Sequence, residues 1–224
     1  MDEKRAVILL SGGLDSATTL AIAREKSFRC YALSFRYGQR HSKELECASA
    51  LARHYDVVEH LVLDIPLDKI KGSALTDDDH DIPMDRDMDE GIPSTYVPAR
   101  NIIFLSFALA WAESLGAESI FIGANALDFS GYPDCTPEFF KNFDGVVKTG
   151  TKSGVEGREI NIEVPLLSKT KAEIIELGTS LGVPFVKTWS CYVGDEKACG
   201  RCDSCRLRVK GFQMARVRDP IEYL

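Results

Sequence analysis

Short apolar runs rich in β-branched residues alternate along this chain with longer stretches rich in Ala, Leu and charged residues. The short runs are typical of buried strands, and the longer stretches are typical of helices. The sequence predicts strands over residues 5–10, 30–35, 57–63, 119–122 and 160–164. It predicts helices over residues 16–26, 42–54, 99–115, 170–181 and 203–212. Alternation with short connections predicts an α/β fold, a parallel sheet with helices on both faces.

Two segments interrupt this alternation. Residues 64–98 are polar, with few apolar anchors and an acidic run at 77–81. A loop this long is usually functional or disordered, and the acidic run is more often solvated surface than a metal site. Residues 150–157 are glycine-rich and predict a second mobile loop.

Length and charge narrow the possible classes of protein. The chain has 224 residues, 45% of them apolar, which fits one well-packed domain over 1–184 and a small lobe over 185–224. A net charge of −7 argues against a broad nucleic-acid-binding surface. No apolar run has the length of a membrane span, and the polar first residues do not resemble a signal peptide. We therefore expect a cytoplasmic protein without nucleic-acid or membrane partners.

The sharpest motif is Ser11-Gly12-Gly13-Leu14-Asp15-Ser16, between the first predicted strand and the first predicted helix. Adjacent glycines let backbone amides approach an anion, and the helix directs its positive end at the same place. Ser11 and Ser16 add hydroxyl donors. Neither the Walker A nor the Rossmann glycine pattern is present. The alternative is a glycine turn in which Asp15 and Ser16 cap the helix; the full six-residue string favours a phosphate loop.

Four of the seven cysteines are close together near the end of the chain, namely Cys191, Cys199, Cys202 and Cys205. Four thiolates are the number that a closed tetrahedral zinc site requires, so the spacing predicts structural zinc in the 185–224 lobe. An iron–sulfur cluster is the main alternative. Two disulfides are less favoured in a reducing compartment.

The SGGLDS string resembles the signature of the PP-loop ATP pyrophosphatases. Together with FRYGQRH, YVPARN, GANALDFSGYPDC and CGRCDSC, it makes essentially the whole chain resemble the 7-cyano-7-deazaguanine synthases. The resemblance implies a PP-loop (adenine nucleotide alpha-hydrolase-like) domain that splits ATP into AMP and pyrophosphate. It also implies a homodimer, Mg²⁺ accompanying ATP, and structural Zn²⁺.

The reaction that the resemblance implies belongs to queuosine biosynthesis. A carboxylate oxygen of 7-carboxy-7-deazaguanine attacks ATP, and ammonia converts the acyl-adenylate to an amide. A second ATP activates the amide oxygen, and loss of AMP leaves the nitrile. Preorganised donors and cations would stabilise the negative charge that both activations concentrate.

Site residues follow from matching these motifs. Ser11, Asp15, Ser16 and Arg100 are the expected catalytic residues, with Arg100 a cation for the phosphates or the substrate carboxylate. The expected ATP contacts are Ile8, Leu9, Leu10, Ser11, Gly12, Gly13, Leu14, Asp15, Ser16, Ala17, Thr18 and Lys171. Asp128, Tyr132 and Asp134 are expected to bind the deazaguanine, whose edge offers N–H donors.

Other interpretations of individual residues remain open. Lys171 matches a phosphate-side lysine of related PP-loop enzymes, yet an exposed helix lysine explains it equally well. Cys135 is better explained as a small buried residue than as a nucleophile. Asp15 would order the loop or a Mg²⁺ ion.

Two other functions compete. A PP-loop ligase could act on tRNA, although such enzymes usually carry basic RNA-binding surface. A zinc-stabilised module could bind the nucleotide without consuming it. Pyrophosphate release with 7-carboxy-7-deazaguanine and ammonia separates the three.

Overall fold

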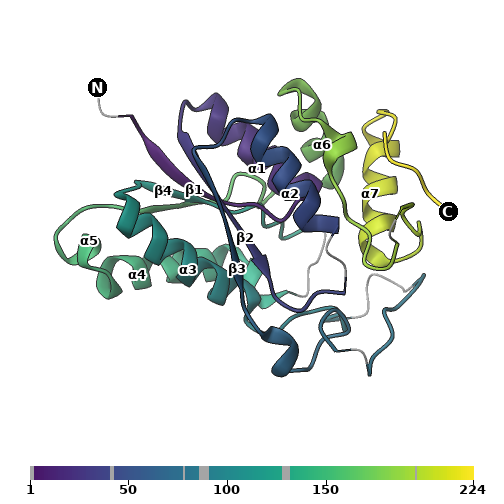
Figure 1. The fold of residues 1–224 in the computed structure, drawn as a ribbon, viewed down its shortest axis with the longest axis horizontal. Coiled ribbons are helices and arrows are strands. Elements are labelled where there is room, and N and C mark those ends of the chain that lie inside the picture. The colour runs from purple at the N-terminus through teal and green to yellow at the C-terminus, as the bar shows by residue number, and fades with distance from the viewer. Residues whose placement is uncertain (1–2, 41–42, 78, 86–90, 128–131, 195) are drawn as a thin grey trace.

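The structure is a computed structural model that describes residues 3–40, 43–77, 79–85, 91–127, 132–194 and 196–224. Five parallel strands form one sheet in the order β3-β2-β1-β4-β5. The strands are β1 (Arg5–Leu9), β2 (Arg29–Arg36), β3 (Glu59–Asp64), β4 (Ser119–Phe121) and β5 (Asn161–Glu163). Figure 1 shows helices on both faces, so the predicted α/β architecture is confirmed.

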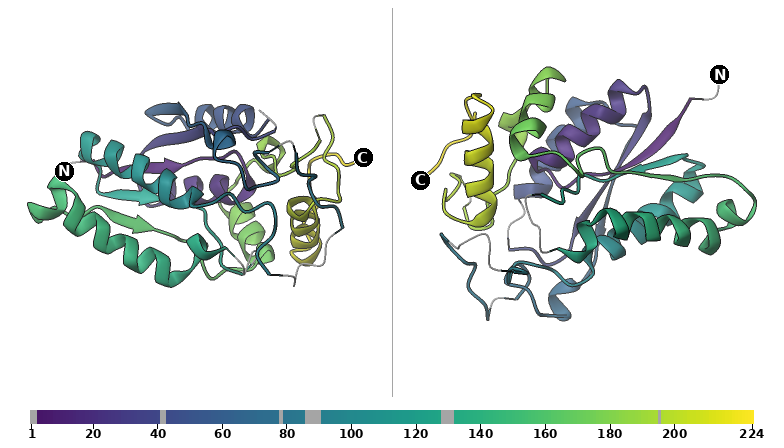
Figure 2. Two further views of the ribbon diagram at one scale, coloured as in Figure 1. Left: turned by 90° about the horizontal axis from the view of Figure 1, so that it is seen from below. Right: turned by 180° about the vertical axis from the view of Figure 1, so that it is seen from behind.

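The helices divide into two layers, which Figures 1 and 2 show from three sides. One layer holds α1 (Leu14–Glu25), α2 (Lys43–His54), α6 (Lys171–Ser180) and α7 (Asp203–Met214). The other holds α3 (Arg100–Leu115), α4 (Pro137–Gly150) and α5 (Lys152–Val155). Short 3₁₀ turns lie at η1 (Leu67–Lys69), η2 (Pro133–Cys135) and η3 (Phe185–Lys187). Among the described residues, none of the helices is long and apolar enough to span a membrane.

Alternate residues of the central strand β1 enter different cores. Val7 and Leu9 join the core beneath α3 and α4, whereas Ala6 and Ile8 join the core beneath α1 and α2. Full burial of a side chain such as Ile8 contributes about 1.5–3 kcal/mol. Because β1 is buried on both faces, its sequence is a continuous apolar run.

The C-terminal residues 185–224 extend both of these cores. Phe185 and Phe212 lie in the core with α1 and α2, and Trp189 lies in the core with α3. The C-terminal residues thus share their hydrophobic cores with the rest of the chain. A domain boundary between residues 184 and 185 stays a prediction.

Helix α4 is absent from the sequence-based prediction. Thr136 begins it by accepting a hydrogen bond from the amide of Phe139 at 3.1 Å. Pro137 occupies the first turn, where its missing N–H costs nothing. Phe140, Phe143 and Val147 recur at helical spacing and are buried. The signal was present in the sequence, in the order Thr-Pro followed by periodic apolar residues.

The predicted mobile loop at 150–157 is wrong. Gly150 is the last residue of α4, and Lys152–Val155 forms the short helix α5. The amide of Ser153 donates to Glu113 Oε1 at 2.7 Å, which ties α5 to α3. A Cβ at Gly154 would collide with the carbonyl oxygens of α4, so this glycine serves close packing.

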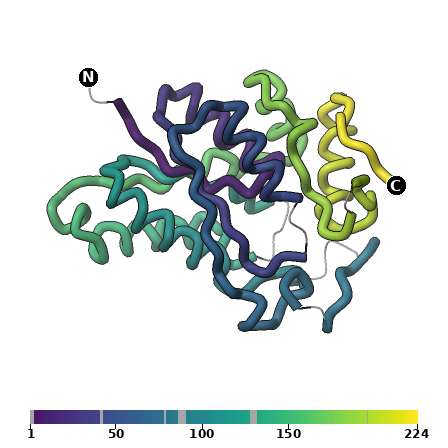
Figure 3. Tube along the Cα trace, viewed as in Figure 1, coloured from purple at the N-terminus to yellow at the C-terminus, as the bar shows by residue number. Residues whose placement is uncertain are grey.

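Residues 64–98 have the predicted irregular structure, but the expectation of few anchors is wrong. Figure 3 shows the segment running back toward the C-terminal part of the chain. Five apolar side chains bury it in the core, namely Leu67, Ala74, Leu75, Ile82 and Val97. Asp77, in the acidic run, is buried rather than solvated, and the Arg40 guanidinium donates to its carbonyl oxygen at 2.9 Å.

Candidate active site

The sheet order places two loops beside one crevice. Strands β1 and β4 are neighbours, and the chain leaves β1 toward β2 but leaves β4 toward β5. Loops at the carboxyl ends of such strands separate and leave room for a ligand. A cavity of about 260 Å³ opens there, lined by residues from the β1–α1 loop, β2, α2, α3, the loop after β4, and the C-terminal region.

The loop after β1 is closed by its own hydroxyl groups. Ser11 Oγ donates to Ser16 Oγ at 3.1 Å, and Ser16 Oγ donates to the carbonyl of Gly13 at 3.0 Å. Gly12 has a φ of +90°, and a Cβ there would collide with the carbonyl oxygen of Glu44 in α2. Glycine is therefore required at this position on both conformational and steric grounds.

The first turn of α1 has no side-chain cap. Gly13 is its N-cap residue and makes no side-chain hydrogen bond to the helix. The amides of that turn consequently remain available to an anion at the positive end of the helix. The alternative in which Asp15 and Ser16 serve as the helix cap is wrong.

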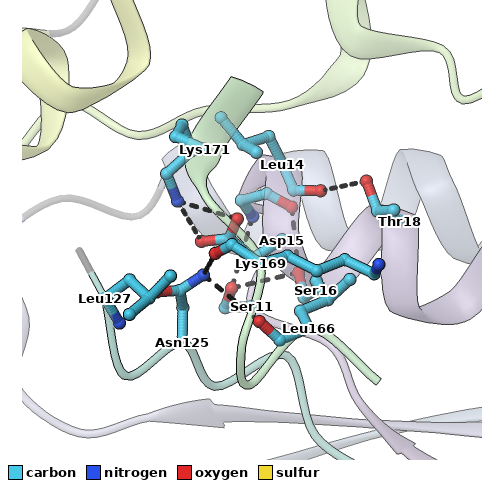
Figure 4. A network of polar contacts seen from close by, with 11 residues as sticks. Ser11, Leu14, Asp15, Ser16, Thr18, Asn125, Leu127, Leu166, Lys169 and Lys171 are labelled. Atoms are coloured by element: carbon cyan, nitrogen blue, oxygen red, sulfur yellow. Dashed lines mark hydrogen bonds and ion pairs between the residues drawn. The ribbon is translucent and has the colours of Figure 1, made fainter. Parts of the chain in front are cut away.

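Lys171 reaches the same loop from α6 (Figure 4). Its Nζ lies 2.8 Å from both carboxylate oxygens of Asp15, and its side chain is only 10% exposed. A capping box between Thr170 and Glu173 fixes the beginning of α6. The interpretation of Lys171 as an exposed surface lysine is wrong.

The residues predicted to contact ATP divide into two groups. Leu9, Leu10, Ser11, Gly13, Leu14, Asp15, Ser16 and Lys171 line the cavity. Ile8 and Ala17 are instead buried in the core beneath α1. Thr18 donates its hydroxyl to the carbonyl of Leu14 at 2.8 Å, and Gly12 packs against α2. Those four residues support the loop from behind.

Arg100 lines the cavity from the first residue of α3. The preceding Ala99 is left-handed with a φ of 54°, and its amide donates to the Tyr96 hydroxyl at 3.2 Å. Such a conformation costs a non-glycine residue about 1–2 kcal/mol. It changes the direction of the backbone immediately before α3 begins. Burial alone would lower the pKa of Arg100, but Tyr37 and other neighbouring groups raise it overall. Within the described ranges, no carboxylate forms an ion pair with this guanidinium.

Asp134 has a different task from the predicted one. Its Oδ2 accepts a hydrogen bond from the amide of Asn101 at 3.0 Å, and Asn101 Nδ2 donates to its carbonyl oxygen at 3.0 Å. The residue is buried and does not line the cavity. Its carboxylate accepts a hydrogen bond from a backbone amide in the first turn of α3 and so helps to position Arg100. Asp128, also predicted to bind substrate, lies outside the described residues.

Aromatic side chains form the wall opposite the phosphate loop. Tyr132, Tyr37 and Phe104 line the cavity, and Tyr132 is held by a 3.2 Å hydrogen bond between its hydroxyl and Thr95 Oγ1. Phe35 stacks on Phe104 with ring centroids 4.1 Å apart. Aromatic faces of this kind suit a flat heterocycle.

Cys135 also lines the cavity. It is buried, and burial raises the pKa of its thiol to about 11. The thiol is therefore protonated at neutral pH, as expected for a packing residue rather than a nucleophile.

The four clustered cysteines converge on one point. Their Sγ atoms all lie within 4.8 Å of one another, and those of Cys199 and Cys205 are 3.9 Å apart. A tetrahedral ion with Zn–S bonds of about 2.3 Å places its sulfurs roughly 3.8 Å apart. An iron–sulfur cluster spreads its four thiolates over two or four irons and needs a wider arrangement. The amides of Gly194 and Cys199 donate to Cys191 Sγ at 3.0 and 3.3 Å, which favours thiolate. The set fits a single zinc ion.

Comparison with known proteins agrees with these features. A family model described as "Queuosine biosynthesis protein QueC" matches residues 5–216. The chain belongs to the QueC family.

Close relatives span the whole chain. A 7-cyano-7-deazaguanine synthase of Coxiella burnetii is 56% identical over 99% of this chain and 98% of the relative. One of Citrifermentans bemidjiense is 58% identical over the same shares of the two chains. Among solved structures, a 4-thiouridine synthetase in complex with RNA and bound ATP superposes with a TM-score of 0.50. It is 19% identical over 82% of this chain and 42% of its own, which shows a shared fold.

Several cavity residues of this QueC family member have no signal in the sequence. Glu44, Trp189, Tyr192 and Arg208 come from α2 and the C-terminal region. The amide of Trp189 donates to the carbonyl of Gly12 at 2.9 Å. Arg208 is 1% exposed and is held by Asp219 at 2.8 and 2.9 Å. These residues come together only through the order of the strands and through the cysteine turn, the segment 191–202 that carries the first three clustered cysteines.

Proposed function

We propose that this chain is a 7-cyano-7-deazaguanine synthase. It converts 7-carboxy-7-deazaguanine and ammonia to 7-cyano-7-deazaguanine, with two ATP molecules cleaved to AMP and pyrophosphate. The observation that supports this most strongly is a single cavity that joins an uncapped helix N-terminus to an aromatic wall. An ATP and a flat heterocyclic carboxylate could meet there.

The phosphate loop is the proposed site of the departing pyrophosphate. Ser11 and Ser16 hold the loop in shape through their own hydrogen bonds, the amides in the first turn of α1 supply neutral donors, and Lys171 supplies a positive charge. Asp15 is proposed to order Lys171, since both its oxygens contact Nζ. Mg²⁺ is proposed to arrive with ATP. These preorganised groups would stabilise charge on the phosphates as the α-phosphorus is attacked.

Arg100 is proposed to neutralise the reacting oxyanions. It lies on the same cavity as Tyr132 and Tyr37, and no described carboxylate pairs with it. A guanidinium suits a carboxylate or a phosphate oxygen equally well. Tyr132 is proposed to contact the deazaguanine ring, and the assignment of Asp128 stays a prediction.

Zinc is proposed to have a structural role. Cys191, Cys199, Cys202 and Cys205 would hold it with no coordination position left for water or substrate. When bound, the ion supplies a cross-link that maintains the turn following Trp189. The homodimer stays a prediction.

A direct assay tests the reaction. The full chain, loaded with zinc, is incubated with ATP, ammonium and 7-carboxy-7-deazaguanine, and AMP, ADP, pyrophosphate and nitrile are quantified. Two AMP and two pyrophosphate per nitrile are expected. Silence with this substrate and AMP formation with tRNA would favour a tRNA ligase; silence with both would favour a non-catalytic nucleotide-binding module.

A further inference from the structure

Two carboxylates line the cavity within the described part of the chain, Asp15 and Glu44. Asp15 is occupied by Lys171 through both of its oxygens. Glu44 lies in the first turn of α2, where the backbone of Gly12 is in close contact with its carbonyl oxygen. The helix thus holds the Glu44 backbone against the phosphate loop, and Glu44 lines the cavity onto which that loop opens.

Among the described residues, none forms an ion pair with the Glu44 carboxylate. The carboxylate also forms no side-chain hydrogen bond with any residue that the structure describes. Charged or titratable groups act on it from each surrounding element, namely Tyr37 after β2, Cys47 on its own helix, Arg100 on α3, and Cys191 and Tyr192 in the C-terminal region. Burial raises the pKa of Glu44 to about 7, although the positive charge of Arg100 partly offsets this.

The proposed reaction needs a group of this kind. Ammonium predominates over ammonia at neutral pH and has no lone pair with which to attack. The balanced step is acyl-adenylate plus ammonium giving amide, AMP and two protons. The nitrogen forms the C–N bond, and the C–O bond to AMP breaks with its electron pair leaving on AMP. One proton must leave before the attack and one after it.

We propose that Glu44 is a catalytic residue that binds the incoming ammonium and accepts a proton from it, an inference that rests on the proposed function. Its negative charge attracts the cation into a poorly solvated cavity. A carboxylate that lies beside the reacting groups can accept the first proton and release it to solvent. The product of this transfer is ammonia held beside the acyl-adenylate, with its lone pair free.

Glu44→Gln tests the proposal, with Glu46→Gln as the matched control. Glu46 is two residues away on the same helix and is exposed, so its replacement removes the same charge outside the cavity. In the full zinc-loaded chain, Glu44→Gln is expected to lower kcat/KM for ammonium by about 10²–10⁴-fold, the usual range for a lost general base. Pyrophosphate release in the absence of ammonium, which reports the first adenylation, should fall far less than the ammonium-dependent turnover does. Glu46→Gln should match wild type in both assays.

Hydroxylamine separates a base from a merely structural residue. It is neutral at pH 7 and attacks without prior deprotonation, so it should give hydroxamate with Glu44→Gln at close to the wild-type rate. Glu44→Asp, which retains a carboxylate, should keep a measurable share of the ammonium-dependent activity. Circular dichroism verifies that each variant is folded.

Three outcomes would overturn the proposal. Glu44→Gln could use ammonium as well as Glu46→Gln does, it could lose pyrophosphate release together with ammonium turnover, or hydroxylamine could fail to restore its activity. A wild-type chain that releases no pyrophosphate would refute the proposed function itself. That result is distinct from an active wild type with an equally active Glu44→Gln.

Discussion

The phosphate loop and the cysteine cluster lie side by side but differ in whether their backbone amides already have hydrogen-bond acceptors. In the cluster, backbone amides donate inward, as those of Gly194 and Cys199 do to Cys191 Sγ. In the phosphate loop, the first turn of α1 is left without a side-chain cap. A structural centre satisfies its own donors, whereas a binding centre leaves them for a ligand. The contrast assigns stability to one region and chemistry to the other.

One residue connects these two regions. The Trp189 amide donates to the carbonyl of Gly12 at 2.9 Å, and its indole Nε1 donates to the carbonyl of Cys191 at 3.1 Å. A residue of the cysteine cluster and a glycine of the phosphate loop are thereby hydrogen-bonded to the same tryptophan. Disturbing the cysteines should therefore affect the phosphate loop, while disturbing the loop should leave the cysteines intact.

Cys202→Ser is expected to have the largest effect. Losing one of four thiolates should release zinc, whose apparent contribution to such sites is roughly 10–16 kcal/mol. We expect loss of the metal and of soluble protein. Metal analysis and thermal melting measure this, with Cys47→Ser as the control because Cys47 lies outside the cluster. A folded, zinc-loaded but inactive Cys202→Ser would show that the cysteines have a chemical role.

Asp15→Ala is expected to abolish turnover while leaving the fold intact. The change frees Lys171, whose Nζ lies 2.8 Å from both Asp15 oxygens. Loss of one preorganised group commonly costs about 10²–10³-fold in kcat, and the displaced lysine should add to this. Pyrophosphate release and circular dichroism check both halves of the prediction. Glu25→Ala, at the exposed end of the same helix, is the control; near-normal activity of Asp15→Ala would refute the loop assignment.

Glu44→Gln should stabilise the protein at alkaline pH. Burial raises the Glu44 pKa from 4.5 to about 7, so the folded state binds this proton more tightly than the unfolded state. Stability is therefore lost as pH rises between about 4.5 and 7, and the full penalty persists above 7. The variant should gain about 1–3 kcal/mol at pH 8 and less at pH 5.5. Urea unfolding at both values measures this; a variant less stable than Glu46→Gln at pH 8 would be incompatible with a carboxylate whose ionisation opposes folding.

Arg201→Ala should have the smallest effect. Its guanidinium pairs with Asp85 at 2.7 Å, joining the 64–98 segment to the cysteine turn, but both side chains are more than half exposed. Exposed pairs contribute about 0–1 kcal/mol because water and salt screen them. The buried side chains of Leu75 and Ile82 should hold the segment instead. The control is Lys210→Ala, a change on the exposed side of α7. A decrease in melting temperature much larger than that of the control would show that the ion pair contributes more to stability than expected.

The features that the sequence predicted well are those carried by neighbouring residues. The phosphate loop and the four cysteines are contiguous or nearly so, and the short apolar runs locate the strands to within a few residues. Helix α4 begins at Thr136–Pro137 directly after a loop dense in polar groups, so its capping signal overlaps a segment whose composition is typical of a binding loop.

The features that could not be predicted depend on tertiary contacts. Glu44, Trp189 and Tyr192 meet only because α2 and the cysteine turn pack at the same end of the sheet. Asp134 shows the converse. It lies in the expected loop and has the expected charge, but its Oδ2 accepts a hydrogen bond from the amide of Asn101 and the residue does not line the cavity. Residue type and position along the chain do not reveal which hydrogen bonds are already made.

Isotope transfer tests the proposed chemistry most directly. The 7-carboxy-7-deazaguanine substrate is labelled with ¹⁸O in both carboxylate oxygens and turned over with unlabelled ATP and ammonium, and the products are weighed by mass spectrometry. If the phosphate loop holds pyrophosphate while the substrate oxygens attack the α-phosphorus, each AMP should carry one ¹⁸O and pyrophosphate none. Label in inorganic phosphate, or formation of ADP in place of AMP, would show that this loop does not direct the cleavage of ATP.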